Sequence, residues 1–238
     1  MERVAVLADV HGNAAALAAV LKDVRRQGVD GILLGGDYVL FGPRPGEAVD
    51  LLRSLDAPAV VGNTDAYLFQ DPEDPLCRWT RGDIGEDGLR WLENLPFGHR
   101  LNDLLLVHAN PTDLVGLLVT EPNPFMPFEV TAEEKAKELL GDARADLVVY
   151  GHIHWASQGT FDGQRVASVG SVGFPSDGDR RAAYGIAQFD GAHWQLSHRR
   201  VAYDHRSVAR EIRESGTALA EPRAQRIEKA AYVPLRES

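Results

Sequence analysis

Short apolar runs between Arg3 and His152 end, one after another, on residues that can bind a metal ion. The runs are Arg3–Ala8, Gly31–Gly36, Ala57–Asn63, Asp103–Ala109 and Ala145–His152. They are rich in Val, Leu and Ile, which is typical of buried strands. Segments with the periodicity of helices lie between several of them, at residues 13–28, 45–55 and 131–140. Strands that alternate with helices predict a parallel sheet with helices packed against it.

The polar residues at the ends of these runs share oxygen and imidazole nitrogen as donor atoms. They are Asp9, His11, Asp37, Asn63, His108, His152 and His154. Ligands of open α/β sheets collect beyond the carboxyl ends of the strands, so we expect these side chains at one edge. His152 and His154 are two residues apart, and residues at that spacing point to the same face of an extended chain.

Each of these residues also has a simpler structural interpretation. Asp9 could cap the helix that follows it, and Asp37 and Asn63 could be turn residues after glycine. A single histidine at a strand end is usually a hydrogen-bonded structural residue. None of these interpretations accounts for histidines at the matching strand ends. Clustered carboxylates would repel and clustered imidazoles would tend to protonate, whereas a cation offsets both effects, so the set predicts a metal site.

The donor atoms indicate which metals suit this site. A set of oxygen and imidazole nitrogen without sulfur suits Mn²⁺, Fe, Zn²⁺, Co²⁺ or Ni²⁺ better than Ca²⁺ or Mg²⁺, which prefer oxygen alone. The candidate ligands exceed what one ion needs, so we expect two divalent ions about 3.5–4 Å apart, with one carboxylate bridging them.

The chain after His154 has a different pattern. Residues 165–201 contain short strands joined by Asp/Gly turns, which predicts antiparallel strands or a second sheet. A tail of one or two surface helices is expected at about 205–238. No linker or repeat marks a boundary, so we expect one domain over residues 1–238, with the metal-binding motifs at 9–154.

Composition excludes several classes of protein. The net charge of −10 argues against tightly held DNA or RNA, and no apolar run is long enough for a signal peptide or a membrane span. A single cysteine, Cys77, excludes an internal disulfide and a thiolate cluster, which fits a reducing compartment. The cytoplasm is the expected location, and the oligomeric state is left open.

The motifs taken in order resemble those of the calcineurin-like metallophosphoesterases. They are D-x-H at Asp9, G-D at Gly36, G-N-x-D at Gly62, a histidine after a strand at His108, and G-H-x-H at Gly151. The segments "GDYVLFGPRPGEAVDLL" and "GSVGFPSDGDRRAAYGI" are similar to a bacterial branch of small phosphodiesterases related to diadenosine tetraphosphatase. The resemblance implies an α/β fold, a four-layer α/β/β/α sandwich of two mixed sheets flanked by helices.

The resemblance also implies a role for each motif residue. Asp9, His11 and His154 would hold one metal, and Asn63, His108 and His152 the other, with Asp37 as the bridge. The implied catalytic set is Asp37, Asn63, Asp65 and His108. The reaction would be hydrolysis of a phosphodiester or phosphomonoester by direct attack of metal-bound hydroxide, with manganese as the first choice of functional metal.

One position departs from the family pattern. Many members have histidine after the Asn of G-N-x-D, where it is thought to help protonate the leaving group, but this chain has Thr64. A threonine hydroxyl can donate a hydrogen bond but is no general acid near neutral pH. Thr64 therefore favours substrates with good leaving groups, such as aryl phosphates or polyphosphates.

Substrate contacts are expected from loops around the site. Asn13 could bind substrate or a ligand, or equally serve in the first turn of a helix. Arg44 and Arg180, the latter beside Arg181, are candidates for phosphate contacts. The segment at residues 120–130, rich in proline and aromatic residues, could be a wall or lid over the site, or a rigid surface loop.

Two other functions compete with a phosphoesterase of small phosphorylated molecules. The chain could be a non-catalytic metal-binding scaffold of the same fold, as Thr64 would allow. Against this, a scaffold has little reason to keep a full set of seven ligands. A nuclease of the same family is disfavoured by the acidic charge and by the lack of a basic groove signature.

Overall fold

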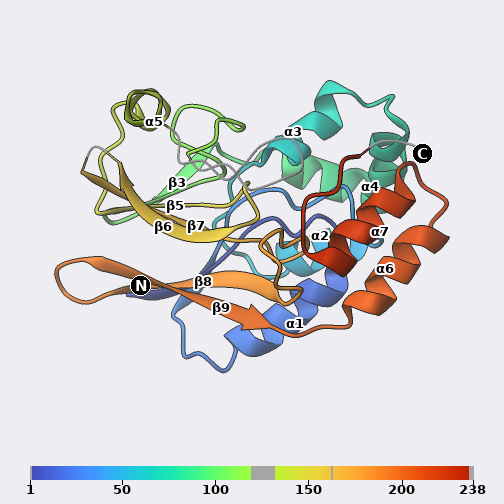
Figure 1. Ribbon diagram of the computed structural model, residues 1–238, viewed down its shortest axis with the longest axis horizontal. Helices are drawn as coiled ribbons and strands as arrows, with labels where there is room; N and C mark the ends of the chain where they lie inside the picture. Colours follow the sequence, from blue (N-terminus) through green and yellow to red (C-terminus); the bar gives the residue numbers. More distant parts are fainter. Residues whose placement is uncertain (1, 119–131, 162, 236–238) are drawn as a thin grey trace.

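The computed structural model describes residues 2–118, 132–161 and 163–235 and contains two β-sheets with helices on their outer faces (Figure 1). The first sheet has the strand order β2-β1-β8-β9. Its strands are β1 (Arg3–Leu7), β2 (Gly31–Leu34), β8 (Ala182–Phe189) and β9 (Trp194–Val201). β1 runs parallel to β2, with Val4 opposite Gly31, and antiparallel to β8, with Arg3 opposite Gln188. The sheet is therefore mixed.

The second sheet has the strand order β3-β4-β5-β7-β6. Its strands are β3 (Gly98–Leu101), β4 (Leu104–Val107), β5 (Leu147–Tyr150), β6 (Ala156–Phe161) and β7 (Gln164–Val169). β4, β5 and β7 are parallel, and the outer strands β3 and β6 are antiparallel to their neighbours. This sheet is also mixed.

The alternating side chains of β1 show how the layers are held together. Val4 and Val6 are buried between the two sheets, in a cluster with Leu106 of β4. Ala5 and Leu7 point to the other face, as alternation in a strand requires. There they pack in the cluster under α1 (Ala14–Val24) and α2 (Pro45–Arg53).

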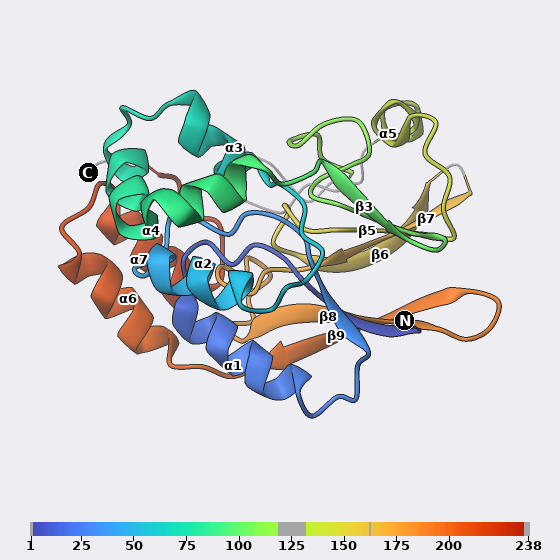
Figure 2. The same ribbon diagram turned by 180° about the vertical axis from the view of Figure 1, so that it is seen from behind.

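The second sheet has its own outer layer. Val148 and Tyr150 of β5 pack against Leu139 of α5 (Glu133–Leu140). Figure 2 shows α5 on one outer side of the molecule and α1 on the opposite side, with both sheets between them. The four-layer α/β/β/α sandwich of two mixed sheets is confirmed.

The remaining helices lie at the end of the molecule opposite the β8–β9 turn (Figures 1 and 2). They are α3 (Asn63–Gln70), α4 (Pro75–Glu93), α6 (His205–Glu214) and α7 (Ala220–Lys229). α4 is kinked at Gly85, where φ is 64°. Val208 and Ile212 of α6 and Ile227 of α7 pack with Phe174, so the predicted helical tail is docked on the body.

Three expectations differ from the structure. The third predicted strand, 57–63, forms only an isolated bridge between Ala59 and Leu34, because Pro58 has no N–H to extend the ladder. The strands of 165–201 do not form one sheet: β7 joins β5, whereas β8 and β9 complete the first sheet. Helices α3 and α4 were not expected. The possible lid at 120–130 lies outside the described residues.

The described segments contain no helix that is both long and apolar enough to cross a membrane.

Candidate metal site

The predicted ligands meet where loops from both sheets come together. The ends of β1 and β2 supply Asp9, His11 and Asp37, and the ends of β4 and β5 supply the other three histidines. Asn63 is the first residue of α3. All seven predicted ligands lie in this one site, and their polar atoms fall into two groups that share Asp37.

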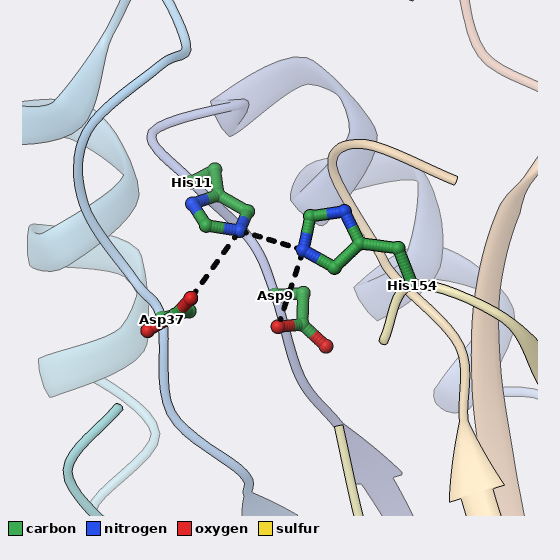
Figure 3. A group of neighbouring side chains, drawn as sticks. All are labelled: Asp9, His11, Asp37 and His154. Atoms are coloured by element: carbon green, nitrogen blue, oxygen red, sulfur yellow. Dashed lines mark hydrogen bonds and ion pairs between the residues drawn. The ribbon is translucent and has the colours of Figure 1, made fainter. Parts of the chain in front are cut away.

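The first group contains Asp9, His11, Asp37 and His154, whose ligand atoms all lie within 4.8 Å of one another. His11 Nε2 is 2.9 Å from His154 Nε2 and 3.5 Å from Asp37 Oδ2. His154 Nε2 is 3.5 Å from Asp9 Oδ1. Figure 3 shows the two rings and the two carboxylates directed toward a common space. This geometry places two oxygen and two nitrogen donors around one point.

The second group contains Asp37, His108 and His152, again within 4.8 Å, and Asn63 joins it. Asn63 Oδ1 lies 2.9 Å from His108 Nε2 and 2.9 Å from His152 Nδ1. His108 Nε2 is 3.4 Å from Asp37 Oδ1. Because Asp37 directs one oxygen at each group, it has the position that a bridging carboxylate needs.

Each of the four histidines has one ring nitrogen within hydrogen-bond distance of a backbone carbonyl. The pairs are His11 Nδ1 with Val39 O at 3.2 Å, His108 Nδ1 with Gly35 O at 2.9 Å, His152 Nε2 with Val115 O at 3.2 Å, and His154 Nδ1 with Phe174 O at 2.7 Å. A carbonyl cannot donate, so the hydrogen must be on the ring nitrogen. The other nitrogen of each neutral ring then directs a lone pair into the site, as in metal-binding histidines.

The tautomers of His11 and His154 bear on whether this group of residues fits a cation. With both Nδ1 atoms protonated, the Nε2 atoms of His11 and His154 oppose two lone pairs at 2.9 Å. Protonation of His11 would relieve the repulsion, but burial holds the pKa of that imidazole well below its usual value. A cation between the nitrogens would accept both lone pairs and would be attracted by the carboxylates of Asp9 and Asp37 beside them. The first group therefore fits a divalent metal ion.

Asn63 is weaker evidence for a metal ion, because both orientations of its side-chain amide can be satisfied. With Oδ1 inward, the oxygen faces two lone pairs, from His108 and His152, and needs a cation. With the amide reversed, its nitrogen donates to both histidines at 2.9 Å and to Asp37 Oδ2 at 3.3 Å. The second group can thus be satisfied with or without a metal, so the first group carries the argument.

Burial and mutual charge shift the pKa values of the acidic ligands in opposite directions. Burial raises the pKa of the Asp37 carboxyl above its ordinary value. Burial also acts to raise the pKa of Asp9, but the attraction of His154, with His108 and His11, leaves that pKa below the ordinary value. A cation would favour the ionised form of both carboxylates.

The histidines of the second group are also shifted. Burial, together with the charge of His108, lowers the pKa of His152 to about 4. Burial acts to lower the pKa of His108 too, but Asp37 and Asp9 raise it above the ordinary value. Neutral His152 is ready to bind a metal near pH 7, and a cation beside His108 would favour the neutral form of that ring, which can bind it.

The backbone is strained at most of these positions. Five candidate ligands have positive φ: Asp9 (55°), His11 (49°), Asp37 (56°), His152 (65°) and His154 (54°). Residues other than glycine adopt this left-handed backbone region at a cost of roughly 1–3 kcal/mol each, and such strain clusters at functional sites. The fold therefore holds these five residues in a costly backbone conformation, as is common at functional sites.

Asp65 lies behind the ligands and belongs to neither group. Its Oδ2 accepts from the backbone N–H of Asp37 at 2.9 Å and of Gly62 at 3.0 Å, and its Oδ1 accepts from Tyr38 N at 2.9 Å. Fully buried, it fixes the loop that carries Asp37 to the start of α3. These contacts position the loop, and a catalytic role for Asp65 stays a prediction.

The expected substrate residues are more scattered. Asn13 caps α1, with Oδ1 accepting from Ala16 N at 3.1 Å, so the structure shows its alternative role. Thr64 lies at the site: its N–H donates to Asp37 Oδ1 at 2.8 Å and its hydroxyl to Val39 O at 3.3 Å.

The two arginines lie on the surface of the molecule. Arg44 pairs with Glu211 of α6 at 2.8 Å, and Arg180 donates to the carbonyl of Glu228. Neither is part of the ligand groups, and a phosphate contact for either arginine stays a prediction.

Sequence reasoning missed the groups that orient the ligands. The four carbonyl acceptors leave no sequence signal, because any residue type supplies a backbone oxygen. It also missed Phe41, whose ring lies 5.0 Å from the His11 ring, and Arg223, which donates to Phe41 O at 2.9 Å. In the sequence, Arg223 is one of several arginines in the predicted helical tail, and nothing there distinguishes it from the others.

Comparison with known proteins agrees with this geometry. The family model described as the calcineurin-like phosphoesterase superfamily domain matches residues 2–192. The uncharacterized protein MJ0912 of Methanocaldococcus jannaschii is 29% identical over 236 residues, which cover 88% of this chain and 91% of the relative.

Two solved structures are similar over nearly their whole length. A metallophosphoesterase from Sphaerobacter thermophilus has a TM-score of 0.78 and 27% identity, with 97% of this chain and 99% of that chain covered. The hypothetical protein PH1004 from Pyrococcus horikoshii OT3 has a TM-score of 0.74 and 17% identity, with 98% of each chain covered, which is a likeness of fold.

Proposed function

The chain belongs to the calcineurin-like phosphoesterase superfamily, and from that premise we propose that it is a phosphodiesterase or phosphatase dependent on two divalent metal ions. Asp9, His11 and His154 would hold one ion, Asn63, His108 and His152 the other, and Asp37 would bridge them. The observation that carries the proposal is the opposition of two lone pairs at His11 and His154, next to a carboxylate shared by two ligand groups.

Two divalent ions held there would lower the pKa of a water so that hydroxide forms near neutral pH, and would offset the charge that grows on the phosphoryl oxygens. Manganese is our first choice, with Fe, Zn²⁺, Co²⁺ and Ni²⁺ as alternatives that the same donor set suits.

The contribution of the chain itself is to hold these ligands in fixed positions. The carbonyl acceptors lock the orientation of each histidine ring, and the three N–H bonds to Asp65 hold the Asp37 loop. Ligands locked in this way bind a metal without reorganisation, which supports affinity and rate.

Thr64 limits which esters are good substrates. Its hydroxyl donates to Val39 O and cannot protonate a leaving group near neutral pH. Esters whose leaving group is stable as an anion should therefore react faster than simple alkyl esters.

We further propose a small phosphorylated molecule as the substrate and the cytoplasm as the location. The net charge of −10 opposes a long nucleic acid, and the single cysteine is a buried free thiol, which suits a reducing environment.

The test is hydrolysis of bis-p-nitrophenyl phosphate and p-nitrophenyl phosphate by metal-stripped protein, with and without added Mn²⁺. We expect turnover only with metal, and expect Asp37→Asn to abolish it while His99→Ala, outside both ligand groups, retains it. Bound metal without turnover in Mn²⁺, Co²⁺, Ni²⁺ or Zn²⁺ would favour the non-catalytic scaffold instead.

A further inference from the structure

We propose that a cavity beside the metal site binds an uncharged aromatic group esterified to the phosphate. The inference rests on the proposed function and narrows it, because Thr64 alone leaves aryl phosphates and polyphosphates as equal candidates. The cavity lies between α3, the loop after β2, the loop after β4 and the C-terminal segment, and its volume is about 470 Å³. This is within the range of roughly 300–1,000 Å³ that is usual for small-molecule sites.

The cavity is adjacent to the metal site. Asn63 and Thr64 line both, and Thr64 N donates to Asp37 Oδ1 at 2.8 Å. Phe41 forms another part of the wall, and its ring lies 5.0 Å from that of His11. A phosphate at the ligand groups would therefore have its ester group at the entrance of this cavity.

The lining is mostly apolar and includes two aromatic rings. The apolar residues that matter most are Leu40, Phe41, Tyr67, Leu76, Leu114 and Val115. A planar ring between Phe41 and Tyr67 would gain both apolar burial and ring–ring contact.

The charges of the lining oppose a second phosphate. No lysine or arginine occurs among the lining residues that the structure describes, and Asp74 adds a carboxylate. A polyphosphate chain entering the cavity would meet no cation there and would be repelled by Asp74. The lining therefore favours an uncharged group over further phosphates.

Two residues at the cavity expose apolar surface to water. In the described part of the chain, the large hydrophobic side chains that are clearly exposed are Tyr67 (40%), Phe97 (40%) and Val115 (61%). Two of these three line the cavity. Exposed apolar surface that gathers at a hollow next to a polar site indicates a binding surface.

The walls are held in place by the same contacts that order the metal ligands. Val115 O accepts from His152 Nε2 at 3.2 Å, so the loop after β4 is tied to a candidate ligand. On the opposite wall, Leu40 and Phe41 both have positive φ, 66° and 67°, and the buried Arg223 holds Phe41 O at 2.9 Å. A preformed cavity of this kind costs little ordering on binding.

The experiment is calorimetric titration of metal-loaded protein with methylphosphonate, phenylphosphonate and 3-phosphonopropionate. All three present a phosphonate to the metals, but only phenylphosphonate adds an uncharged ring. We expect phenylphosphonate to bind about tenfold tighter than methylphosphonate or better, from burial of the ring. The carboxylate of 3-phosphonopropionate should give no gain over methylphosphonate.

Two variants connect this preference to the cavity. Ala66→Trp fills it from α3, and Val115→Asp places a charge at its mouth on an exposed side chain that carries little packing. Each should reduce the preference for phenylphosphonate to about twofold or less, because the ring loses its apolar site. Ala18→Trp, on the exposed surface of α1, is the matched control and should keep the wild-type preference.

Equal affinity of wild-type protein for methyl- and phenylphosphonate would overturn the inference and leave the proposed function standing. So would a preference that survives both variants. Failure of all three phosphonates to bind in the presence of metal would overturn the proposed function as well, because methylphosphonate requires only the metal site.

Discussion

The Nε2 atoms of His11 and His154 lie 2.9 Å apart, although 143 residues separate the two histidines in the chain. The Nδ1–H of His11 donates to Val39 O, and the Nδ1–H of His154 donates to Phe174 O. Neither Nε2 can therefore donate while the rings are neutral. A buried pair of acceptors at this distance is unfavourable by itself and favourable around a cation. This relationship is the strongest structural reason to assign a metal to the site.

Replacing His154 by Ala should remove one metal ion and leave the other. The first ligand group loses a nitrogen donor, whereas Asn63, His108 and His152 of the second group remain. We expect metal content to fall from two ions to one per chain and hydrolysis to drop by at least roughly 100-fold, since even changes behind a ligand cost 10- to 100-fold. Elemental analysis after dialysis, with His99→Ala as the control, measures this; an unchanged content of two would contradict the assignment.

Gly62→Ala should disrupt the site by steric conflict alone. A Cβ at Gly62 would lie 2.1 Å from Asp37 N and 2.2 Å from Asp37 Oδ1, so the Asp37 loop would have to move. We expect both weaker metal binding and a lower free energy of unfolding.

Gly82 provides the matched comparison, because it lies within α4 and a Cβ there meets nothing within 4 Å. Gly82→Ala should stabilise the protein by up to about 1 kcal/mol, the difference in helix propensity. Denaturant unfolding and metal titration of the two variants give the answer, and equal metal affinity in both would show that the Asp37 loop tolerates displacement.

The sequence was sufficient to predict the layers of the fold and the residues that gather at the candidate metal site, and each prediction had a different basis. Strand–helix alternation predicted a parallel sheet with helices against it, and the resemblance to the calcineurin-like metallophosphoesterases implied the four-layer sandwich. The motifs predicted ligands that prove to lie together. It was insufficient where pairing between distant segments decides the outcome. Residues 57–63 have the composition of a strand, but Pro58 limits pairing to Ala59, and the chain turns into α3 at Asn63.

The site was predicted incompletely for a related reason. The ring orientation of each histidine depends on a carbonyl from a distant loop, such as Phe174 O for His154, 20 residues on. Asp65 was expected in the catalytic set because it is part of the motif, but three backbone N–H groups occupy its oxygens. Only the three-dimensional structure shows which groups surround each motif residue.

Arg223 is expected to be important for stability although it lies in the C-terminal tail. It is 1% exposed and donates to Phe41 O, Leu219 O and the Thr217 hydroxyl. Arg223→Met leaves these acceptors without their donor and should cost about 1–3 kcal/mol in the free energy of unfolding.

The exposed Arg206 on α6 is the control for Arg223, and Arg206→Met should change stability by less than about 0.5 kcal/mol. Urea unfolding monitored by tryptophan fluorescence compares the two. A similar, small effect for both would mean that α7 does not hold the Phe41 loop.

Cys77 should be inert in the folded protein. It is fully buried, and burial raises the pKa of its thiol to about 12. Since the pKa in the unfolded chain is about 8.5, the folded state retains its proton where the unfolded state loses it. The stability contributed by the neutral thiol is therefore fully present below about pH 8.5 and decreases as pH rises toward 12.

Thiol labelling with Ellman's reagent at pH 8 checks the prediction for Cys77. We expect rapid reaction in urea and reaction limited by opening of the structure in buffer. Prompt labelling of the folded protein would contradict the burial of this residue on the inner face of α4.

The central claim is that Asp37 bridges two metal ions, and anomalous diffraction from crystals of the manganese-loaded protein tests it most directly. The account predicts two anomalous peaks per chain, about 3.5–4 Å apart, one on each side of the Asp37 carboxylate. A single peak, or peaks that do not share Asp37, would contradict it.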